Sequence, residues 1–272
     1  MRVGRTFAIG DAAYLILVCT GPGLFGGDRV RQSIHVGRGA RVVLTSQSAL
    51  QIHPCAPEPW RRRAAPPAIL PPFRPSDIRP CPPAVLPSCP PALYDHRYVI
   101  EDDGELHCHW DPVIPFADAS LVQQFDINLL STSRLYWSDA LMSGRTSRGE
   151  RWRFRDVAHR LRLTVDGSLT YLERFTLAAA DRDVMHPWMA SQADYLGTTI
   201  VYHTQATADI ADALQRELDA GSAVAGVDLT APRLLVARLL ASRGPSFATA
   251  RDVLRRSVLA RIFHTPQLIG RK

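Results

Sequence analysis

Short apolar or alternating runs, separated by turns rich in Gly and Asp, dominate the chain up to about residue 177. Alternation of apolar and polar positions is typical of half-buried strands. Gly37-Arg38-Gly39 predicts a turn, after which Ala40–Ser46 returns beside Val30–Val36, and Asp166-Gly167 predicts a hairpin. The predicted strands are Ala13–Cys19, Val30–Val36, Ala40–Ser46, Tyr98–Ile100, Leu106–Trp110, Leu121–Leu130, Leu135–Met142, His159–Val165 and Leu169–Leu177. The pattern favours an all-β sandwich, barrel or stacked-sheet body.

Two helical patterns follow towards the C-terminus. Ala206–Ala220 places Ile210, Leu214 and Leu218 on one face and reaches Gly221 as a stop signal. Ser246–Phe263 carries a second apolar stripe, with Arg251, Arg255 and Arg256 off it and Ser246 as the expected N-cap. Strands around Thr199–Tyr202 and Leu234–Leu240 flank these helices. The chain shows no βαβ series, GxGxxG turn or Walker loop, which argues against a nucleotide-binding enzyme.

One segment departs from this pattern. Fourteen of the 21 prolines fall between Pro54 and Pro91. Because proline lacks a backbone donor and fixes φ, such a segment does not pair within a central sheet. The sequence predicts a single domain over residues 1–272 that is interrupted by an inserted, disordered loop over residues 54–95.

Composition is that of a globular protein, with 46% hydrophobic and 21% charged residues. The net charge is +6, but the 32 basic residues are all Arg except Lys272 and form no run typical of nucleic-acid binding. The longest apolar run, Ala12–Cys19, is far shorter than the roughly 20 residues that span a bilayer. The five cysteines show no disulfide framework, and the N-terminus is a poor signal peptide. We therefore expect a cytoplasmic protein with neither nucleic acid nor membrane as partner.

The strongest local pattern for metal chemistry is His107-Cys108-His109-Trp110-Asp111. On a strand, His107, His109 and Asp111 share one face and Cys108 lies on the other. Imidazole and carboxylate suit Zn²⁺, Ni²⁺ or Fe²⁺, with His53, His96 or His159 as conceivable further ligands. The alternative is an incidental pair of histidines on an exposed strand.

A polar loop, Gly144–Glu150, follows a predicted strand and contains two glycines. Such a loop can bind an anion through its backbone N–H groups. It can equally be a plain connection in which Glu150 pairs with an arginine. No local motif for a catalytic nucleophile is present in the sequence.

An ordered set of short motifs gives the chain a family resemblance. The motifs are Gly21–Asp28, Gly37–Thr45, Asp111–Phe116, Gly144-Arg145 with Arg148-Gly149-Glu150, Leu172–Phe175 and, more loosely, Gly197-Thr198. With these the chain resembles the urease accessory proteins UreD/UreH over nearly its whole length outside the proline segment. It departs from them in lacking some tens of residues that usually precede the position of Met1. It also has Ala49–His53 in place of a stretch with Lys and Tyr, and His107 and His109-Trp110 where the family has Glu and Leu-Pro.

The resemblance implies a fold of stacked mixed β-sheets with two α-helices towards the C-terminus. It also implies a non-enzymatic scaffold that binds apo-urease and a UreF-type protein, and through the latter a UreG-type GTPase, so that Ni²⁺ reaches urease. No cofactor is expected to be tightly bound, and Ni²⁺ is expected to be transient.

The resemblance also implies site residues. The candidates for a nickel passage are Asp28, Thr45, Asp139, Glu150 and Glu173, and the family-motif loops hold Gly26, Gly27, Gly144, Arg145 and Gly149. For each acid the alternative is a structural pair with Arg145, Arg148, Arg151 or Arg174.

Two other functions compete with the scaffold. One is a metal-dependent enzyme using His107, His109 and Asp111, and the other is a β-sandwich binding module with an aromatic platform built from Trp110, Tyr136, Trp137 and Trp152.

Overall fold

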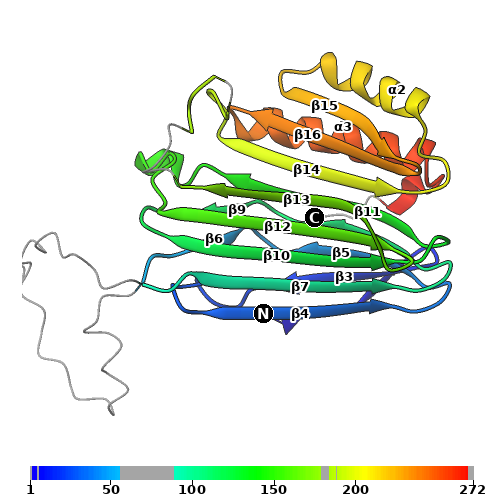
Figure 1. Ribbon diagram of the computed structural model, residues 1–272, viewed down its shortest axis with the longest axis horizontal. Helices are drawn as coiled ribbons and strands as arrows, with labels where there is room; N and C mark the ends of the chain where they lie inside the picture. Colours follow the sequence, from blue (N-terminus) through cyan, green and yellow to red (C-terminus); the bar gives the residue numbers. More distant parts are fainter. Residues whose placement is uncertain (1, 5, 56–88, 179–183, 188, 269–272) are drawn as a thin grey trace, which may run out of the picture.

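The computed structural model describes residues 2–4, 6–55, 89–178, 184–187 and 189–268. Two β-sheets stack face to face, and two helices cover the outer face of the larger sheet (Figure 1). The predicted fold class, stacked mixed sheets with two α-helices near the C-terminus, is confirmed.

The larger sheet is mixed. Its central order is β1 (Arg2–Val3), β3 (Ala12–Val18), β5 (Arg41–Ser46), β8 (Glu105–His109), β11 (Arg134–Met142), β14 (Tyr195–Tyr202), β16 (Leu234–Ala241) and β15 (Val224–Ala231). β2 (Phe7–Ile9) pairs with β3, while β6 (Leu50–Ile52) pairs with β9 (Val113–Pro115), which joins β11. Pairing is parallel from β3 to β11 and antiparallel from β11 to β15. The larger sheet therefore extends beyond the smaller one on the side of β14, β16 and β15 (Figure 1).

The smaller sheet has five strands in the order β13 (Ser168–Leu177), β12 (Asp156–Val165), β10 (Ser120–Leu129), β7 (Ala92–Ile100) and β4 (Arg29–Val36). Only the β12–β13 pair is antiparallel. Its turn is Asp166-Gly167 with φ of 49° and 78°, the left-handed conformation of a tight hairpin, as the sequence predicts.

One predicted hairpin is wrong. Val30–Val36 and Ala40–Ser46 are both strands, but β4 belongs to the smaller sheet and β5 crosses to the larger one. The burial pattern explains the crossing. β5 buries Val43 and Leu44 on its two faces between β3 and β8, whereas β4 is an edge strand with one exposed face.

Large aromatic side chains fill the space between the sheets. Trp137 is fully buried and contacts the rings of Tyr98 and Phe125, with ring centroids 4.9 Å apart in both cases. The four residues of the predicted aromatic platform, Trp110, Tyr136, Trp137 and Trp152, are all buried, with at most 7% of their surface exposed. The binding-module alternative is therefore wrong in its essential feature, because these rings pack in the cores.

The helices α2 (Ala208–Asp219) and α3 (Gly244–Arg261) form the third layer. Thr207 caps α2, which buries Leu214 and Leu218. α3 begins at Gly244 with Pro245 in its first turn, so the prediction of Ser246 as N-cap is wrong. Two short 3₁₀ helices, η2 (Thr146–Arg148) and η3 (Pro266–Leu268), complete the described elements. Neither α-helix in the described part of the chain has the length and apolar character needed to cross a membrane.

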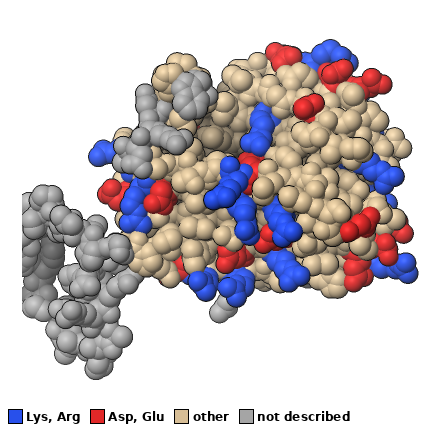
Figure 2. Space-filling model, viewed as in Figure 1, with Lys and Arg blue, Asp and Glu red and all other residues tan. Residues whose placement is uncertain are grey.

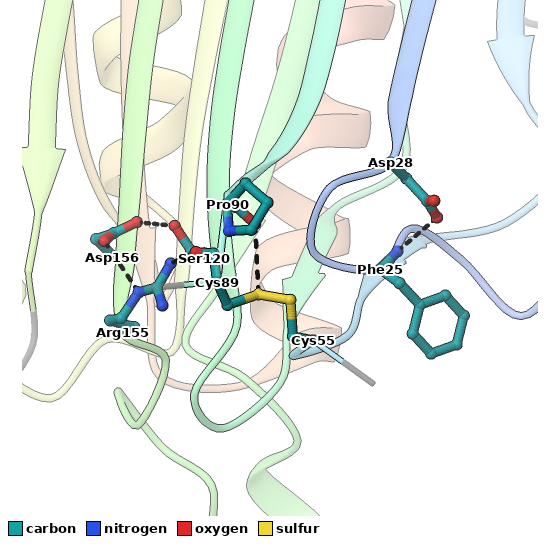
Figure 3. Close-up of a disulfide and its surroundings, with 8 residues drawn as sticks. All are labelled: Phe25, Asp28, Cys55, Cys89, Pro90, Ser120, Arg155 and Asp156. Carbon is teal, nitrogen blue, oxygen red and sulfur yellow. Dashed lines mark hydrogen bonds and ion pairs between the residues drawn. A yellow bond between two sulfur atoms is a disulfide. The ribbon is translucent and has the colours of Figure 1, made fainter. Parts of the chain in front are cut away.

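A disulfide joins Cys55 and Cys89, which the sequence analysis does not anticipate (Figure 3). Cys55 follows β6 of the larger sheet and Cys89 precedes β7 of the smaller sheet, so the bond ties the two sheets together at one end. The predicted insertion over residues 54–95 falls for the most part on residues 56–88, which lie outside the described residues. Its end is wrong, because residues 92–95 already belong to β7.

Candidate functional site

A cavity of about 250 Å³ lies between the sheets beside the edge strand β13. It forms there because the larger sheet continues past β13, so side chains of β14 and β16 have no strand of the smaller sheet opposite them. Polar side chains from both sheets line it: Gln123, His159 and Glu173 from the smaller sheet, and Asp139, Thr198 and Arg238 from the larger. Strand alternation directs all six into the space between the sheets.

Glu173 lies at the wall of this cavity, 5% exposed. Its carboxylate accepts hydrogen bonds from the Arg238 guanidinium at 3.1 Å and from the Tyr171 hydroxyl at 3.1 Å. The Thr198 hydroxyl donates to it at 3.4 Å. Burial raises the pKa of Glu173, while Arg238 and these hydrogen bonds oppose the rise. The arginine side chain is 52% exposed, which places a positive charge at the cavity entrance.

Asp139 is the most perturbed acid of the cavity. Burial, together with the nearby charge of Glu173, raises its pKa from 3.8 to about 7, although Arg251 and Arg238 act in the opposite direction. Within the described residues, no hydrogen bond joins this carboxyl group to another side chain. Asp139 is therefore a buried acid that exchanges a proton near neutral pH.

A second, smaller cavity of about 20 Å³ adjoins the first. The two share Gln123, Asp139 and Ala140 as lining residues. Ser46, Ser48 and Asp111 line the far side of the small cavity, which has room for about one water molecule. Asp139 thus stands where the cavities meet, and carboxylate and hydroxyl oxygens continue from Glu173 to Asp111.

The structure brings together two of the five predicted passage residues, Asp139 and Glu173. Thr45 donates to the carbonyl oxygen of His109 at 2.7 Å and, by strand alternation, faces the helix layer. Asp28 is exposed and accepts from the backbone N–H of Phe25 at 2.8 Å (Figure 3). Glu150 pairs with the Arg145 guanidinium, the structural alternative for this acid. Neither cavity is lined by Asp28, Thr45 or Glu150.

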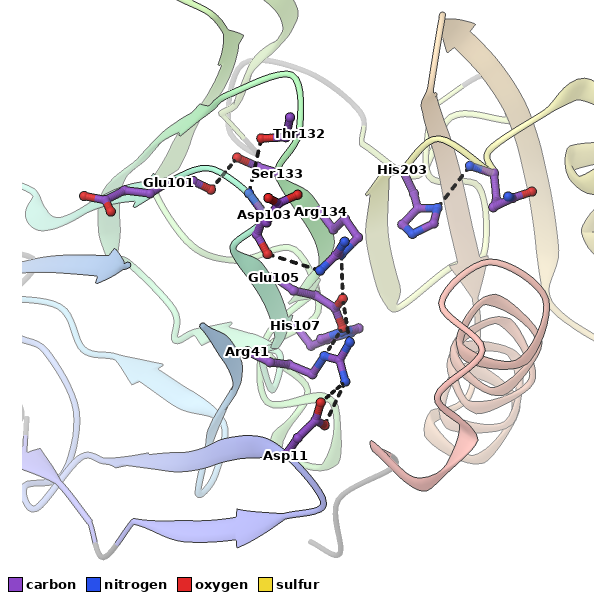
Figure 4. Close-up of polar contacts among 11 residues, drawn as sticks. Asp11, Arg41, Glu101, Asp103, Glu105, His107, Thr132, Ser133, Arg134 and His203 are labelled. Atoms are coloured by element: carbon purple, nitrogen blue, oxygen red, sulfur yellow. Dashed lines mark hydrogen bonds and ion pairs between the residues drawn. The ribbon is translucent and has the colours of Figure 1, made fainter. Parts of the chain in front are cut away.

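The predicted metal cluster of His107, His109 and Asp111 is wrong. β8 ends at His109, so Asp111 lies beyond the strand, where it accepts from the Ser46 hydroxyl at 3.0 Å. His107 is buried with its Nε2 atom 2.7 Å from Glu105 (Figure 4). Across the described ranges, no three His, Cys, Asp or Glu side chains form a group that could hold a metal ion. The three residues on which the metal-dependent alternative was based thus do not form one site.

The further histidines considered as ligands also pack in separate places. His53 stacks on Phe25, His96 contacts Tyr94 and His159 stacks on Phe175. Burial lowers the pKa of His96 to about 3 and that of His159 to about 4, so both rings are neutral at pH 7.

The two family-motif loops have mainly structural contacts. Gly26 lies against the Cys55–Cys89 disulfide, and the backbone N–H of Gly27 donates to the carbonyl oxygen of Pro91 at 3.3 Å. In the second loop, the Arg145 guanidinium stacks 3.8 Å over the Phe116 ring while it pairs with Glu150. Both loops therefore hold the ends of the two sheets together.

Gly144 offers a direct test of that structural role. Its φ is 125°, and a β-carbon at this position would overlap the carbonyl oxygen of Glu150. We expect Gly144→Ala to lower the free energy of unfolding by about 2–3 kcal/mol, measured by urea denaturation. Gly149→Ala is the matched control, because Gly149 also has a positive φ of 70° but open space around its β-position. Equal losses in the two variants would contradict the steric explanation.

Several site residues are not found by sequence reasoning. Thr198 lies in the loosely matching Gly197-Thr198 motif, whereas Gln123 and Arg238 sit in ordinary strand patterns with no local signal. The helical pattern predicts Arg251 off the apolar stripe, yet its side chain is buried, with 6% exposed. From α3 it donates to the Ser138 hydroxyl at 2.8 Å and to the carbonyl oxygen of Trp110 at 2.9 Å, so it fixes β11 directly next to Asp139.

Comparison with known proteins places the chain in a family. The family model for the UreD urease accessory protein matches residues 1–271. Among curated proteins, the urease accessory protein UreD of Trichodesmium erythraeum is 29% identical over 56% of this chain and 44% of its own length. UreD of Sorangium cellulosum is 28% identical over 75% of this chain and 54% of its own length.

A relative with the other family name also matches. The urease accessory protein UreH of Helicobacter hepaticus is 25% identical over 62% of this chain and 55% of its own length. The chain spans about half the length of these curated relatives. Because the family model covers nearly every residue and the stacked sheets agree with the fold that the resemblance implied, the chain belongs to the UreD urease accessory protein family.

Proposed function

We propose that this protein acts in urease maturation as a non-catalytic accessory protein. It binds apo-urease together with a UreF-type partner, through which a UreG-type GTPase joins, and Ni²⁺ crosses the space between its two sheets on the way to urease. Family membership supports the role in maturation. The polar side chains placed along the two adjoining cavities, from Glu173 past Asp139 to Asp111, support the passage.

The chemistry of the lining suits a cargo that must leave again. Glu173, Asp139 and Asp111 offer carboxylate oxygens, and Thr198 and Ser46 offer hydroxyl oxygens. Oxygen ligands hold Ni²⁺ more weakly than thiolates or imidazoles do, so a partly hydrated ion can step from one to the next. We do not assign a resident metal to this lining, because Ni²⁺ is the cargo.

Asp139 is the single observation that carries the proposal. A buried carboxyl group that only stabilised the fold would be paired, as Glu173 is with Arg238. Asp139 instead has a pKa of about 7 and stands at the junction of two cavities. A passing cation would displace its proton at neutral pH, and the proton would return when the ion moved on.

The test is nickel content per urease active site after co-expression with the urease subunits and the other accessory proteins, read beside the yield of the accessory complex. We expect Asp139→Asn to leave the complex intact and to lower nickel loading several-fold. The double variant with Glu173→Gln should lose more, because each remaining carboxylate partly replaces its neighbour along a hydrated route.

Glu150→Gln is the matched control, since Glu150 is an acid of the same motif set that lines neither cavity. It should change nickel loading little. Normal nickel loading in both Asp139→Asn and the double variant would reject the passage. If Glu150→Gln alone lowered the nickel content of urease, the result would indicate a passage along the loop that holds Arg145.

A further inference from the structure

The outer face of the smaller sheet carries a stripe of arginine side chains. Of the elements that the structure describes, none covers this face (Figure 1), and basic residues run across it (Figure 2). Four of the five strands contribute: β4, β7, β12 and β13. The arginines at outward-facing positions are Arg29, Arg31, Arg97, Arg160, Arg162 and Arg174.

The strand register sets these charges close together. Arg160 of β12 lies directly opposite Arg174 of β13, and Arg162 lies opposite the exposed Leu172. Directly opposed residues of an antiparallel pair have β-carbons roughly 5 Å apart, and like charges at such positions destabilise the sheet. Elsewhere the register places Asp95 opposite Arg31, and Asp126 opposite both Arg97 and Arg162. The like-charge arrangement is therefore confined to Arg160 and Arg174, where an external anion would relieve it.

The face supplies few counter-charges of its own. Its outward acids are Asp95, Asp126 and Asp156, and Glu101 follows β7 on the same side. Asp126 pairs with Arg160 at 3.4 Å. Residues outside the stripe engage the other two paired acids, since Asp156 lies 3.4 Å from Arg155 and Glu101 lies 2.7 Å from His35. In the described part of the chain, the other five arginines of the stripe have no carboxylate partner within 4.0 Å. The six arginines of the stripe thus have two acids among them, Asp95 and Asp126, so the stripe keeps a net positive charge.

We propose that this arginine face docks an acidic surface of a partner protein. Guanidinium groups bind carboxylates in bidentate geometry, and arginine is enriched at protein interfaces. Leu172, 51% exposed between the arginines, adds apolar contact area. A nucleic acid fits less well, because the outward positions of these strands hold no Phe, Tyr or Trp side chain for base stacking.

The position of the face gives the docked partner a second effect, which rests on the proposed function. Arg174 follows Glu173 in β13, so the stripe begins beside the cavity entrance, where Arg238 adds further positive charge. This field repels a cation that approaches the uncovered protein. Carboxylates of the docked partner would neutralise it, so Ni²⁺ would enter the cavity only after the complex has formed.

The test measures the affinity of purified variants for apo-urease and for the UreF-type partner by surface plasmon resonance at low and at high salt. We expect the wild type to bind one of them with an affinity that falls as salt rises. Arg162→Glu with Arg174→Glu should weaken that binding at least tenfold, and Arg162→Lys should keep most of it. Arg216→Glu is the control. Arg216 is an exposed arginine on α2, in the layer on the far side of the larger sheet, and it forms no ion pair with another described residue. Thermal unfolding checks that all variants fold.

Each outcome decides the proposal. Unchanged affinity in the double variant, or an equal loss of affinity in Arg216→Glu, overturns the docking face. The nickel measurement with Asp139→Asn tests the passage separately. Absence of binding to both proteins by the wild type also overturns it. Binding of a short DNA duplex that is as tight as the protein complex, and is lost in the double variant, would identify a polyanion site and overturn the protein partner.

Discussion

Replacement of Asp139 by asparagine is expected to stabilise the protein at about pH 8, by on the order of 4 kcal/mol. The carboxyl group has a pKa of about 7 in the fold against 3.8 as a model value. A raised pKa of an acid means that the folded state disfavours the ionised form, and asparagine removes that charge while keeping the shape.

The sign of the pH dependence follows from the same shift. Below about pH 4 the carboxyl group is protonated in both states, so the wild type and the variant should be similarly stable. Between about pH 4 and pH 7 the unfolded chain has released this proton while the folded wild type retains it, so the stability of the wild type falls as the pH rises, and that of the variant does not. The difference between them should grow from about pH 4 to pH 7 and then remain constant.

Urea denaturation at several pH values measures this difference. Glu150→Gln is the control with the opposite sign, because Arg145 lowers the pKa of Glu150 and the variant loses a favourable pair. A variant at Asp139 that is less stable than the wild type at about pH 8 would show that the carboxylate is fixed by favourable contacts. If Asp139→Asn is more stable than the wild type and also lowers nickel loading, then Asp139 serves the function of the protein although it destabilises the fold.

The second large effect is expected at Glu105, where alanine should lower the free energy of unfolding by about 3–5 kcal/mol. Glu105 is 2% exposed, and its carboxylate accepts from Arg134 Nε at 2.7 Å and lies 2.8 Å from Arg41 Nε (Figure 4). His107 adds a third contact at 2.7 Å. Removal of the acid would leave two guanidinium groups next to each other with their central counter-charge missing.

The pH dependence at this position runs opposite to that at Asp139. Burial would raise the pKa of Glu105, but hydrogen bonds from His107 and Arg134 and the charges of His107 and Arg41 outweigh it and lower the pKa to about 2. Its contribution is therefore fully present above about pH 4.5 and is lost as the pH falls towards 2. The wild type should lose this part of its stability in acid, whereas Glu105→Ala has none of it to lose.

Glu101→Ala provides the matched control in urea denaturation. Glu101 also contacts a histidine, His35 at 2.7 Å, but its side chain is 43% exposed. Such surface pairs contribute at most about 1 kcal/mol. Similar losses at the two positions would contradict the view that the buried cluster anchors β8 between β5 and β11.

Some of the elements could be predicted from the sequence, and others could not. The alternation in Leu135–Met142 and the Asp166-Gly167 turn identify β11 and the β12–β13 hairpin, because both signals are local. β15 (Val224–Ala231) is not among the predicted strands, because small and polar residues interrupt the apolar pattern of this edge strand. The assignment of β5 to a different sheet from β4 depends on which neighbours bury its two faces, and local sequence does not carry that information.

The same distinction between local signals and tertiary contacts applies to the candidate site. By itself the sequence determined the mainly β class, the two helices, the family resemblance and the presence of Asp139 and Glu173 on strands that alternate. Only the tertiary structure decided that these two acids share a cavity, that Glu150 pairs with Arg145, and that His107 binds Glu105 in place of a metal cluster. The physical reason is that strand periodicity fixes the face on which a side chain lies, whereas its partners come from strands far along the chain that meet only when the sheets stack.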